Sequence, residues 1–376
     1  MDFGFSEEQE MLRASARGLL DKECPPAAVR RLMEDERGYD PAVWKKMAGL
    51  GWTGLAIPEE FGGAGLTYVD LALVMEEMGR ALLPSPFIWT AMAAEAIRRA
   101  GSDAQKRAIL PKIAAGETIA ALAWMEPPGG WDAAGIKAAA QKSADGFTLD
   151  GVKLFVNDAH LADLLIVAAR TGGAGEDGVT LFAIDARRAG VEIAPLKTMD
   201  QTRKLSEVRL NGVRAGADEA LGAAGGGWKT LRDTIDRGKV MLAAEMMGGA
   251  QKALEMSVEY AKMRVQFGRP IGSFQAVQHK CANMMVDVES AKSAVYYAAW
   301  AVSNEVAEAP LAAALAKAAA SDAYRKVTAE AIQVHGGIGF TWDHDLHLYF
   351  KRAKSSEFTF GDATWNRELV AQGINL

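Results

Sequence analysis

The chain has 376 residues, 49% of them hydrophobic, which is enough to bury a sizeable core in two or three domains. Its 42 basic and 48 acidic residues leave a net charge of −6, and there is no basic block, which argues against nucleic acid as a partner. Cys24 and Cys281 are the only cysteines in the sequence, so no disulfide framework or cysteine metal site is expected. We expect a cytoplasmic protein without a membrane span, because the N-terminal sequence lacks signal-peptide features and no apolar run approaches ~20 residues.

The first 116 residues are predicted to form a helical domain. Ser6 and Gln9 make a capping box, and leucines and alanines then recur at helical spacing until Pro25-Pro26. Further helical patterns cover residues 41–50, 69–79, 89–100 and 103–114.

The character of the sequence changes near Gly116, and residues 117–224 are predicted to form an antiparallel, β-barrel-like domain. Short apolar runs indicate strands at 119–124, 147–149, 164–167, 179–184 and 208–210. Four dipeptides typical of hairpin turns separate them: Asp145-Gly146, Asp150-Gly151, Asp177-Gly178 and Asn211-Gly212. Helices between the strands, which a parallel α/β sheet requires, are absent from the pattern.

Residues 225–376 are predicted to form a C-terminal four-helix bundle. The triplet Gly225-Gly226-Gly227 is a connector, and long helical patterns follow at 238–263, 275–304 and 311–333. The sequence thus predicts a multidomain α+β protein with the order helical, β, helical.

One candidate ligand site is the run from Arg264 to Gly272, RVQFGRPIG, which is followed by Gln275 and Gln278. The run places a guanidinium and the aromatic ring of Phe267 beside a turn between two helices. Arginine binds phosphate oxygens with a bidentate fork, and a phenylalanine ring can lie against a planar ligand. An arginine at a helix C-terminus is also favourable for the helix dipole alone, so a structural role stays open.

A second candidate is the run Gln333-Val-His-Gly336-Gly337-Ile-Gly339. It follows a helix instead of a strand, which excludes a Rossmann phosphate loop. Its glycines would allow backbone amides to approach a diphosphate, although a helix C-cap explains them equally well. The nearby Asp343-His344-Asp345-Leu-His347 has no metal-specific spacing, so we expect a polar interface or cap and no metal site.

Together these segments resemble the acyl-CoA dehydrogenase superfamily over essentially the whole chain. The two runs stand in the order and at the distance typical of that family, and several shorter segments support the resemblance. These are Gly54-Leu55, Pro58 to Gly63, Glu126-Pro127, Gly151 to Val156, and Asp200 to Arg203.

The resemblance implies an FAD cofactor and an acyl-CoA thioester substrate that is dehydrogenated between its α and β carbons. It implies that Arg264, Phe267 and Gln275, together with Gln333, Gly336 and Gly337, bind the FAD of a neighbouring subunit. A dimer or tetramer, of one kind of subunit or of two, and an electron-transfer partner are therefore expected. Two residues of the β domain, Phe155 and Trp131, are expected beside the FAD, and Lys239 and Phe360 beside the substrate.

This sequence departs from the family at the catalytic base. Gly361 takes the position of the usual glutamate near the C-terminus, and Gly238 takes the alternative position on the first bundle helix. The backbone N–H of Gly361 would still be able to polarise the thioester oxygen. Asp362 is the candidate base and Asp236 a weaker one, while a surface or ion-pair role competes for both.

The expected flavin contacts in the β domain also differ, since Met125 and Trp131 replace hydroxyl residues and Asn157 replaces a threonine. The segments that serve a neighbour's FAD are kept. This asymmetry suggests a subunit of a hetero-oligomeric dehydrogenase that completes the FAD site of a partner. A non-catalytic subunit of that kind, and a flavin oxidase or monooxygenase on the same scaffold, are the alternatives.

Overall fold

The computed structural model describes residues 4–127 and 129–376, which form two compact units interleaved along the chain. One unit comprises the chain up to Arg31 with Thr67–Leu83 and Lys239–Leu376, and the other comprises Leu32–Leu66 and Pro84–Gly238. The predicted domain boundaries at residues 116 and 224 stay a prediction. No helix of the described residues is long and apolar enough to cross a membrane.

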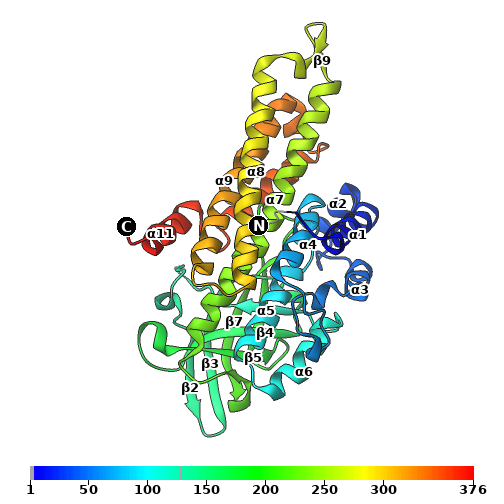
Figure 1. Cartoon of the computed structure of the whole chain (residues 1–376). Coiled ribbons are helices and arrows are strands. Elements are labelled where there is room, and N and C mark those ends of the chain that lie inside the picture. Colours follow the sequence, from blue (N-terminus) through cyan, green and yellow to red (C-terminus); the bar gives the residue numbers. More distant parts are fainter. Residues whose placement is uncertain (1–3, 128) are drawn as a thin grey trace. The chain divides into compact units, whose positions relative to one another are not determined.

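The first unit is helical (Figure 1). Its helices are α1 (Glu7–Glu23), α2 (Pro26–Glu34, which runs into the other unit), α4 (Tyr68–Arg80), most of α7 (Gly227–Met263), α8 (Gln275–Ser303), α9 (Ala309–His335), α10 (Leu346–Phe358) and α11 (Ala363–Gly373). The capping box at Ser6 and Gln9 is confirmed at the start of α1. The connector prediction was wrong at its end, because α7 already begins at Gly227.

Alanine and glycine allow these helices to approach closely. A Cβ at Gly79 of α4 would lie 1.8 Å from the carbonyl oxygen of Glu245 on α7, and one at Gly248 would lie 1.8 Å from that of Glu76. The alanine-rich α9 packs along α8 and against α10 and α11. The closed four-helix bundle stays a prediction.

The second unit contains helices and an eight-stranded sheet. Its helices are α3 (Pro41–Gly49), α5 (Phe87–Ala100), α6 (Asp103–Ala114) and the first turns of α7. The strands are β1 (Ala120–Ala123), β2 (Ala139–Ser143), β3 (Gly146–Asn157), β4 (Leu164–Arg170), β5 (Val179–Asp185), β6 (Val191–Leu196), β7 (Leu205–Gly216) and β8 (Ala220–Leu221). The sheet order is β6-β7-β3-β2-β4-β5-β8, with β1 paired to β4.

The prediction of a purely antiparallel domain was wrong at β1, which pairs with β4 in parallel from Ala120↔Leu164 to Ala123↔Val167. A parallel pair needs a long crossover connection, and the β2–β3 hairpin provides it here. Alternation along each strand cannot reveal this, because it reports which face is buried and not which strand is the neighbour. Closure of the sheet into a barrel stays a prediction.

Two of the four predicted hairpin turns are instead the two sides of one bulge. Asp150-Gly151 lies inside β3 and Asn211-Gly212 inside β7, where the pairing register shifts between Leu149 and Gly151. The carboxylate of Asp150 accepts the N–H of Gly212 at 2.7 Å. Glycine is required at 151, since φ is +153° and a Cβ would meet that of Ala138 at 2.5 Å. The two dipeptides do change the direction of the backbone, but each lies within a strand and does not end it.

Candidate active site

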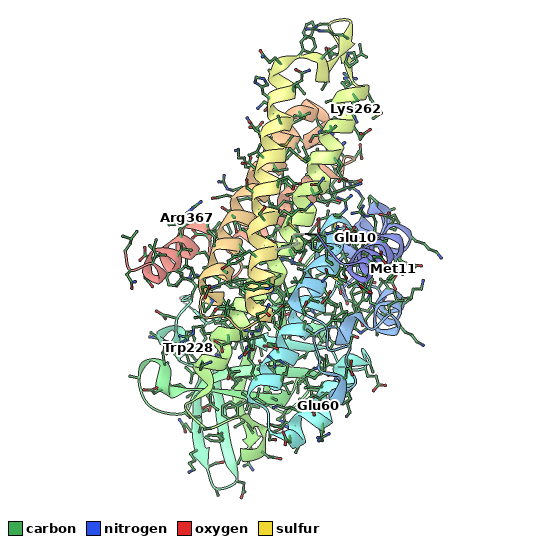
Figure 2. The ribbon with its side chains drawn as sticks, viewed as in Figure 1. Glu10, Met11, Glu60, Trp228, Lys262 and Arg367 are labelled. Carbon is green, nitrogen blue, oxygen red and sulfur yellow. The ribbon has the colours of Figure 1, made fainter. Side chains whose placement is uncertain are left out.

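The run that begins at Arg264 forms the end of α7 and a small hairpin. Lys262, labelled in Figure 2, marks the last turn of α7, and the N–H of Arg264 donates to the carbonyl of Tyr260 at 2.8 Å. Strands β9 (Val265–Gln266) and β10 (Arg269–Pro270) then pair around the two-residue turn Phe267-Gly268. The φ angles of the two turn residues, +52° and +79°, match the turn that suits a tight hairpin.

The hairpin presents Phe267 to solvent. Its side chain is 92% exposed, although the ring of Phe274 lies 6.1 Å away edge to face and the Arg269 guanidinium covers Phe274 at 4.2 Å. A phenylalanine at positive φ on a tip gains little from the folded chain itself. Arg264, Gln275 and Gln278 are exposed as well. This combination favours a surface that another molecule covers.

The second run forms the end of α9. Gln333 is exposed, Gly336 ends the helix with a φ of +63°, and the short helix Gly336–Phe340 follows. A Cβ built at Gly336 or at Gly337 would meet nothing within 4 Å, so the backbone there faces open space. Phe340 is 77% exposed. The N–H of Gly336 caps α9 by donating to the carbonyls of Gln333 and Ile332, so the turn offers an open backbone surface and not a free amide at Gly336.

Two contacts bring both runs to one end of the helices. The ring of Tyr260, one turn before Arg264, stacks on that of His335 at 4.3 Å. Lys280, in the second turn of α8, forms an ion pair with Glu330 near the end of α9. Residues 263–275 and 333–340 therefore form one surface, which we call the exposed helical end. It holds six of the residues predicted to bind FAD: Arg264, Phe267, Gln275, Gln333, Gly336 and Gly337.

The histidines beside this end are used in packing. His335 lies 4.7 Å from the His344 ring, and His347 stacks on Trp342 with 4.7 Å between centroids. The Nδ1 atom of His344 accepts the N–H of Leu346 at 3.2 Å, as in a helix cap. Burial lowers the pKa of His335, His344 and His347, which keeps them neutral near pH 7.

In the sheet unit, the predicted flavin residues stand on two adjacent segments. The N–H of Leu154 donates to the carbonyl of Met125 at 2.9 Å, which joins the loop after β1 to β3. Phe155 sits at a register shift with a φ of +55° and is 54% exposed, while Trp131 stacks at an angle on Trp124 at 5.7 Å.

A buried ion pair supports these segments from inside. Lys153 is fully buried and donates to Glu126, whose carboxylate also accepts the N–H of Ala138 at 3.0 Å. Burial lowers the pKa of Lys153 to about 8. Removing one partner of such a pair leaves an uncompensated buried charge. The structure of both segments therefore depends on the ion pair between Lys153 and Glu126.

The third site is the turn Phe360-Gly361-Asp362, which we call the Gly361 turn. Phe360 is buried at a φ of +61°, and Gly361 has a φ of +85°. A Cβ at Gly361 would lie 2.3 Å from the Cδ1 atom of Trp365. The turn therefore excludes any side chain at position 361 as it stands.

The carboxylate of Asp362 has a structural partner. It is the N-cap of α11 and accepts the N–H of Trp365 at 2.8 Å. This is the capping role that aspartate commonly plays. As candidate base, Asp362 stays a prediction, and the cap is a competing use of the same oxygen. Asp236, the weaker candidate, is buried in the first part of α7 and has partners.

Two buried residues that the sequence did not single out hold the Gly361 turn. Lys317 of α9 is fully buried, and its Nζ donates to the Gly361 carbonyl at 3.1 Å. Asn366 of α11, also fully buried, donates to the carbonyls of Phe360, Gly361 and Asp362 at 2.9 to 3.2 Å. The signal in the sequence was a lysine inside the alanine-rich run 312–320, with Ser321 one turn later.

Burial lowers the pKa of Lys317 to about 7, and the positive charge of Lys239 acts in the same direction. Lys239, predicted to bind substrate, is buried and has partners of its own. The carboxylates of Glu357, Asp362 and Asp322 act on the pKa of Lys317 in the opposite direction.

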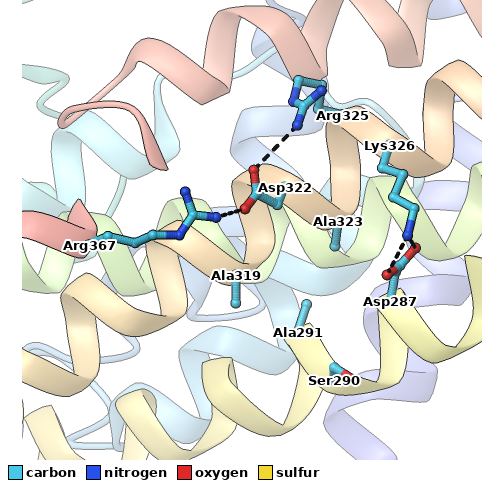
Figure 3. A pocket seen from close by; sticks show the side chains of 9 residues that line it. All are labelled: Asp287, Ser290, Ala291, Ala319, Asp322, Ala323, Arg325, Lys326 and Arg367. Atoms are coloured by element: carbon cyan, nitrogen blue, oxygen red, sulfur yellow. Dashed lines mark hydrogen bonds and ion pairs between the residues drawn. The ribbon is translucent and has the colours of Figure 1, made fainter. Parts of the chain in front are cut away.

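A separate groove of 580 Å³ lies between α8, α9 and α11 (Figure 3). The residues that line it include four small ones, Ser290, Ala291, Ala319 and Ala323, and the ion pairs Lys326–Asp287 and Arg367–Asp322. None of the predicted site residues lines it.

The comparisons with known proteins agree with this architecture. Residues 6–117, 121–213 and 225–375 match sequence models of the N-terminal, middle and C-terminal domains of acyl-CoA dehydrogenases. The acyl-CoA dehydrogenase IpdE2 of Mycolicibacterium smegmatis is 38% identical over 357 residues, which are 95% of each chain. The chain therefore belongs to the acyl-CoA dehydrogenase family of FAD-dependent flavoprotein oxidoreductases.

Solved structures extend the similarity. Butyryl-CoA dehydrogenase from Megasphaera elsdenii superposes with a TM-score of 0.93 at 30% identity and covers 100% of both chains. A chain of the ChsE4–ChsE5 complex from Mycobacterium tuberculosis gives a TM-score of 0.90 at 28% identity, over 100% of this chain and 99% of that one. The second of these relatives is a complex of two different proteins.

Proposed function

We propose that the chain is an FAD-dependent acyl-CoA dehydrogenase subunit that polarises the substrate thioester through the N–H of Gly361, with no glutamate at that position. The observation that carries the proposal is the exposed helical end, where two runs distant in sequence meet. Oligomerisation would bury that surface against a neighbouring subunit and its FAD.

The residues at this end fit a dinucleotide. Arg264 can pair with diphosphate oxygens, and the open backbone at Gly336 and Gly337 allows close approach of phosphates. The ring of Phe267 offers an apolar face to a planar group. Phe155 and Trp131 would face the FAD of their own subunit. When bound, FAD supplies the acceptor for the β-hydrogen, which leaves as hydride.

The remaining chemistry belongs to this chain or its partner. A hydrogen bond from the Gly361 N–H to the thioester oxygen would stabilise enolate charge as the α-proton is lost. Lys239 and Phe360 would line the substrate. A carboxylate must take the α-proton while the bond between the α and β carbons becomes double. Asp362 is the candidate within this chain.

A second form of the function is favoured by the capping hydrogen bond of Asp362. If this carboxylate only caps α11, the base must come from another subunit. The chain would then complete the FAD site of a different, base-carrying partner. The ChsE4–ChsE5 complex shows that a similar protein assembles with a second protein.

Purification with and without a partner distinguishes these forms. The chain alone, and the chain coexpressed with a related subunit encoded beside it, would be measured for flavin per subunit and mass in solution. Both would be assayed with a panel of acyl-CoAs and an artificial electron acceptor. We expect full flavin content and turnover only in the coexpressed complex. Full flavin and robust turnover by the chain alone would refute the hetero-oligomeric form, and absence of flavin in both preparations would refute the proposed function.

A further inference from the structure

Two buried side chains converge on the backbone of the Gly361 turn from different helices. Lys317 donates from Nζ to the carbonyls of Gly361 and Glu357, both at 3.1 Å, and to the hydroxyl of Ser321 at 2.8 Å. The side-chain NH2 group of Asn366 shares its two hydrogens among three successive carbonyls of the turn, at 3.2, 3.0 and 2.9 Å for residues 360, 361 and 362. The turn is thus fixed by donors on one side of its backbone.

The planarity of the peptide bond then decides where the amide hydrogens point. In a trans peptide the N–H lies opposite the C=O. The carbonyl of Phe360 faces Asn366, so the N–H of Gly361, in the same peptide, points away from Asn366. The carbonyl of Gly361 faces Lys317 and Asn366, so the N–H of Asp362 points away from them too. Among the described residues, no acceptor is recorded for the N–H of Gly361 or of Asp362.

This arrangement has a free-energy cost, which indicates that it serves a function. The Oδ1 atom of Asn366 is buried without a hydrogen-bond partner among the described residues. Such an orphan acceptor costs about 1–3 kcal/mol. A buried lysine likewise loses hydration, which only good hydrogen bonds offset. Both residues are placed to serve the carbonyls of the turn.

Hydrogen bonds to a carbonyl also change the other end of the same peptide. They polarise the amide and make its N–H a stronger donor. The amide of Asn366 acts in this way on the Phe360–Gly361 peptide. Lys317 donates to the carbonyl of Gly361 and so holds the next peptide, which fixes the turn on the other side of the Gly361 Cα atom.

We propose that Lys317 and Asn366 are positioning residues that aim the Gly361 N–H as the donor to the thioester oxygen of an acyl-CoA. Asn366 also strengthens this donor, because it binds the carbonyl of the same peptide. This inference rests on the proposed function and deepens it. The new element is the cause of the direction of the Gly361 N–H. A turn without these two side chains would not fix that direction.

The test compares Lys317→Met with Lys326→Met in the FAD-loaded protein, with its partner if one is required. Both lysines lie on α9, but Lys326 is exposed and pairs with Asp287, away from the turn. Bound [1-¹³C]butyryl-CoA and [1-¹³C]octanoyl-CoA would be measured by difference infrared spectroscopy. The carbonyl stretch reports the hydrogen bond to the thioester oxygen directly, which a merely structural role would not alter.

We expect wild type and Lys326→Met to lower the carbonyl frequency equally, and Lys317→Met to lose at least half of that shift. Its kcat should fall about tenfold or more, less than the ~10²–10³-fold that follows outright loss of an oxyanion donor. Its KM and flavin content should change less than threefold. If Lys317→Met does not fold, Asn366→Ala gives the same comparison while Lys317 still holds Gly361.

The possible outcomes distinguish failure of the proposed function from failure of the positioning role. A wild-type protein that shifts the carbonyl of neither probe would overturn the proposed function, and this inference with it. A normal shift in wild type that persists in Lys317→Met, or in Asn366→Ala where that variant is needed, would overturn the positioning role alone. The proposed function would then stand.

Discussion

The exposed helical end and the Gly361 turn differ in what holds them in place. At the helical end, Phe267 is 92% exposed and Arg264, Gln275 and Gln333 face solvent. At the Gly361 turn, Phe360 is 3% exposed and every carbonyl from 360 to 362 accepts a hydrogen bond from a buried side chain. The first region presents its side chains to solvent, whereas the second is held in place by buried side chains of the same chain. Substitutions should therefore act on assembly in one region and on folding and turnover in the other.

The largest effect on stability is expected for Gly361→Ala. The new Cβ would lie 2.3 Å from Trp365 at a φ of +85°. Strain at positive φ costs about 1–2 kcal/mol and overpacking about 1–3 kcal/mol more. The unfolding temperature and the turnover rate would both be measured, and both should be lower than in the wild type.

Gly51→Ala is the matched control for this substitution. Its φ is +78°, but its Cβ would meet nothing within 4 Å. It should lose only the first of the two costs. Equal losses in the two variants would show that Trp365 does not close the site to side chains.

The second largest effect is expected for Arg264→Ala, and it should appear in flavin retention instead of stability. A charged hydrogen bond to phosphate is worth about 1.5–3 kcal/mol, so FAD should bind about 10–100-fold more weakly. The ratio of flavin to protein after dialysis measures this. Lys262→Ala, two residues earlier and paired with Glu259, is the control that should keep its flavin. Unchanged flavin in Arg264→Ala would remove the arginine from the FAD site.

The sequence predicted the exposed helical end better than the buried turn, for a physical reason. Motif residues such as Arg264 and Gly336 are recognised directly, because they stand in short local runs that can be identified without knowledge of distant packing. The role of Lys317 depends on a turn 44 residues later, which no local pattern relates to it. Helix α2 and strands β2 and β6 were likewise missed, since their patterns are weak and tertiary contacts decide them.

A predicted helix matched the structure closely where a strong local signal marked its start. The helix predicted at 103–114 matches α6, which begins after the capping box of Ser102 and Gln105. By contrast, Asp150-Gly151 has the composition of a turn in either a hairpin or a bulge. Only the partner strand, with Gly212 opposite, decides between them.

A smaller effect separates the two roles of Asp362. Asn is as good an N-cap as Asp, so Asp362→Asn should keep its unfolding temperature, whereas Asp362→Ala should lose about 1 kcal/mol of stability. If Asp362 is the base, Asp362→Asn also loses its turnover, because an amide accepts no proton at neutral pH. Steady-state rates on the purified variants check this. Wild-type turnover in Asp362→Asn would show that Asp362 acts only as the N-cap of α11. The base would then be assigned to a partner.

The smallest effect on the chain itself is expected for Phe267→Ala. A ring that is 92% exposed contributes almost no burial, so the unfolding temperature of the flavin-free chain should stay within the range of a surface substitution, about 0.5 kcal/mol. The loss should appear only in assembly and flavin content, because there the ring would be covered. Sedimentation and flavin measurements on the same samples test this, with Phe358→Ala as a control, since that ring is 60% exposed at the end of α10. A large fall in the stability of the flavin-free chain would mean that the tip of the hairpin packs within its own chain. Phe267 would then no longer support the contrast between the exposed helical end, whose residues are expected to contact other molecules, and the Gly361 turn, which its own chain holds in place.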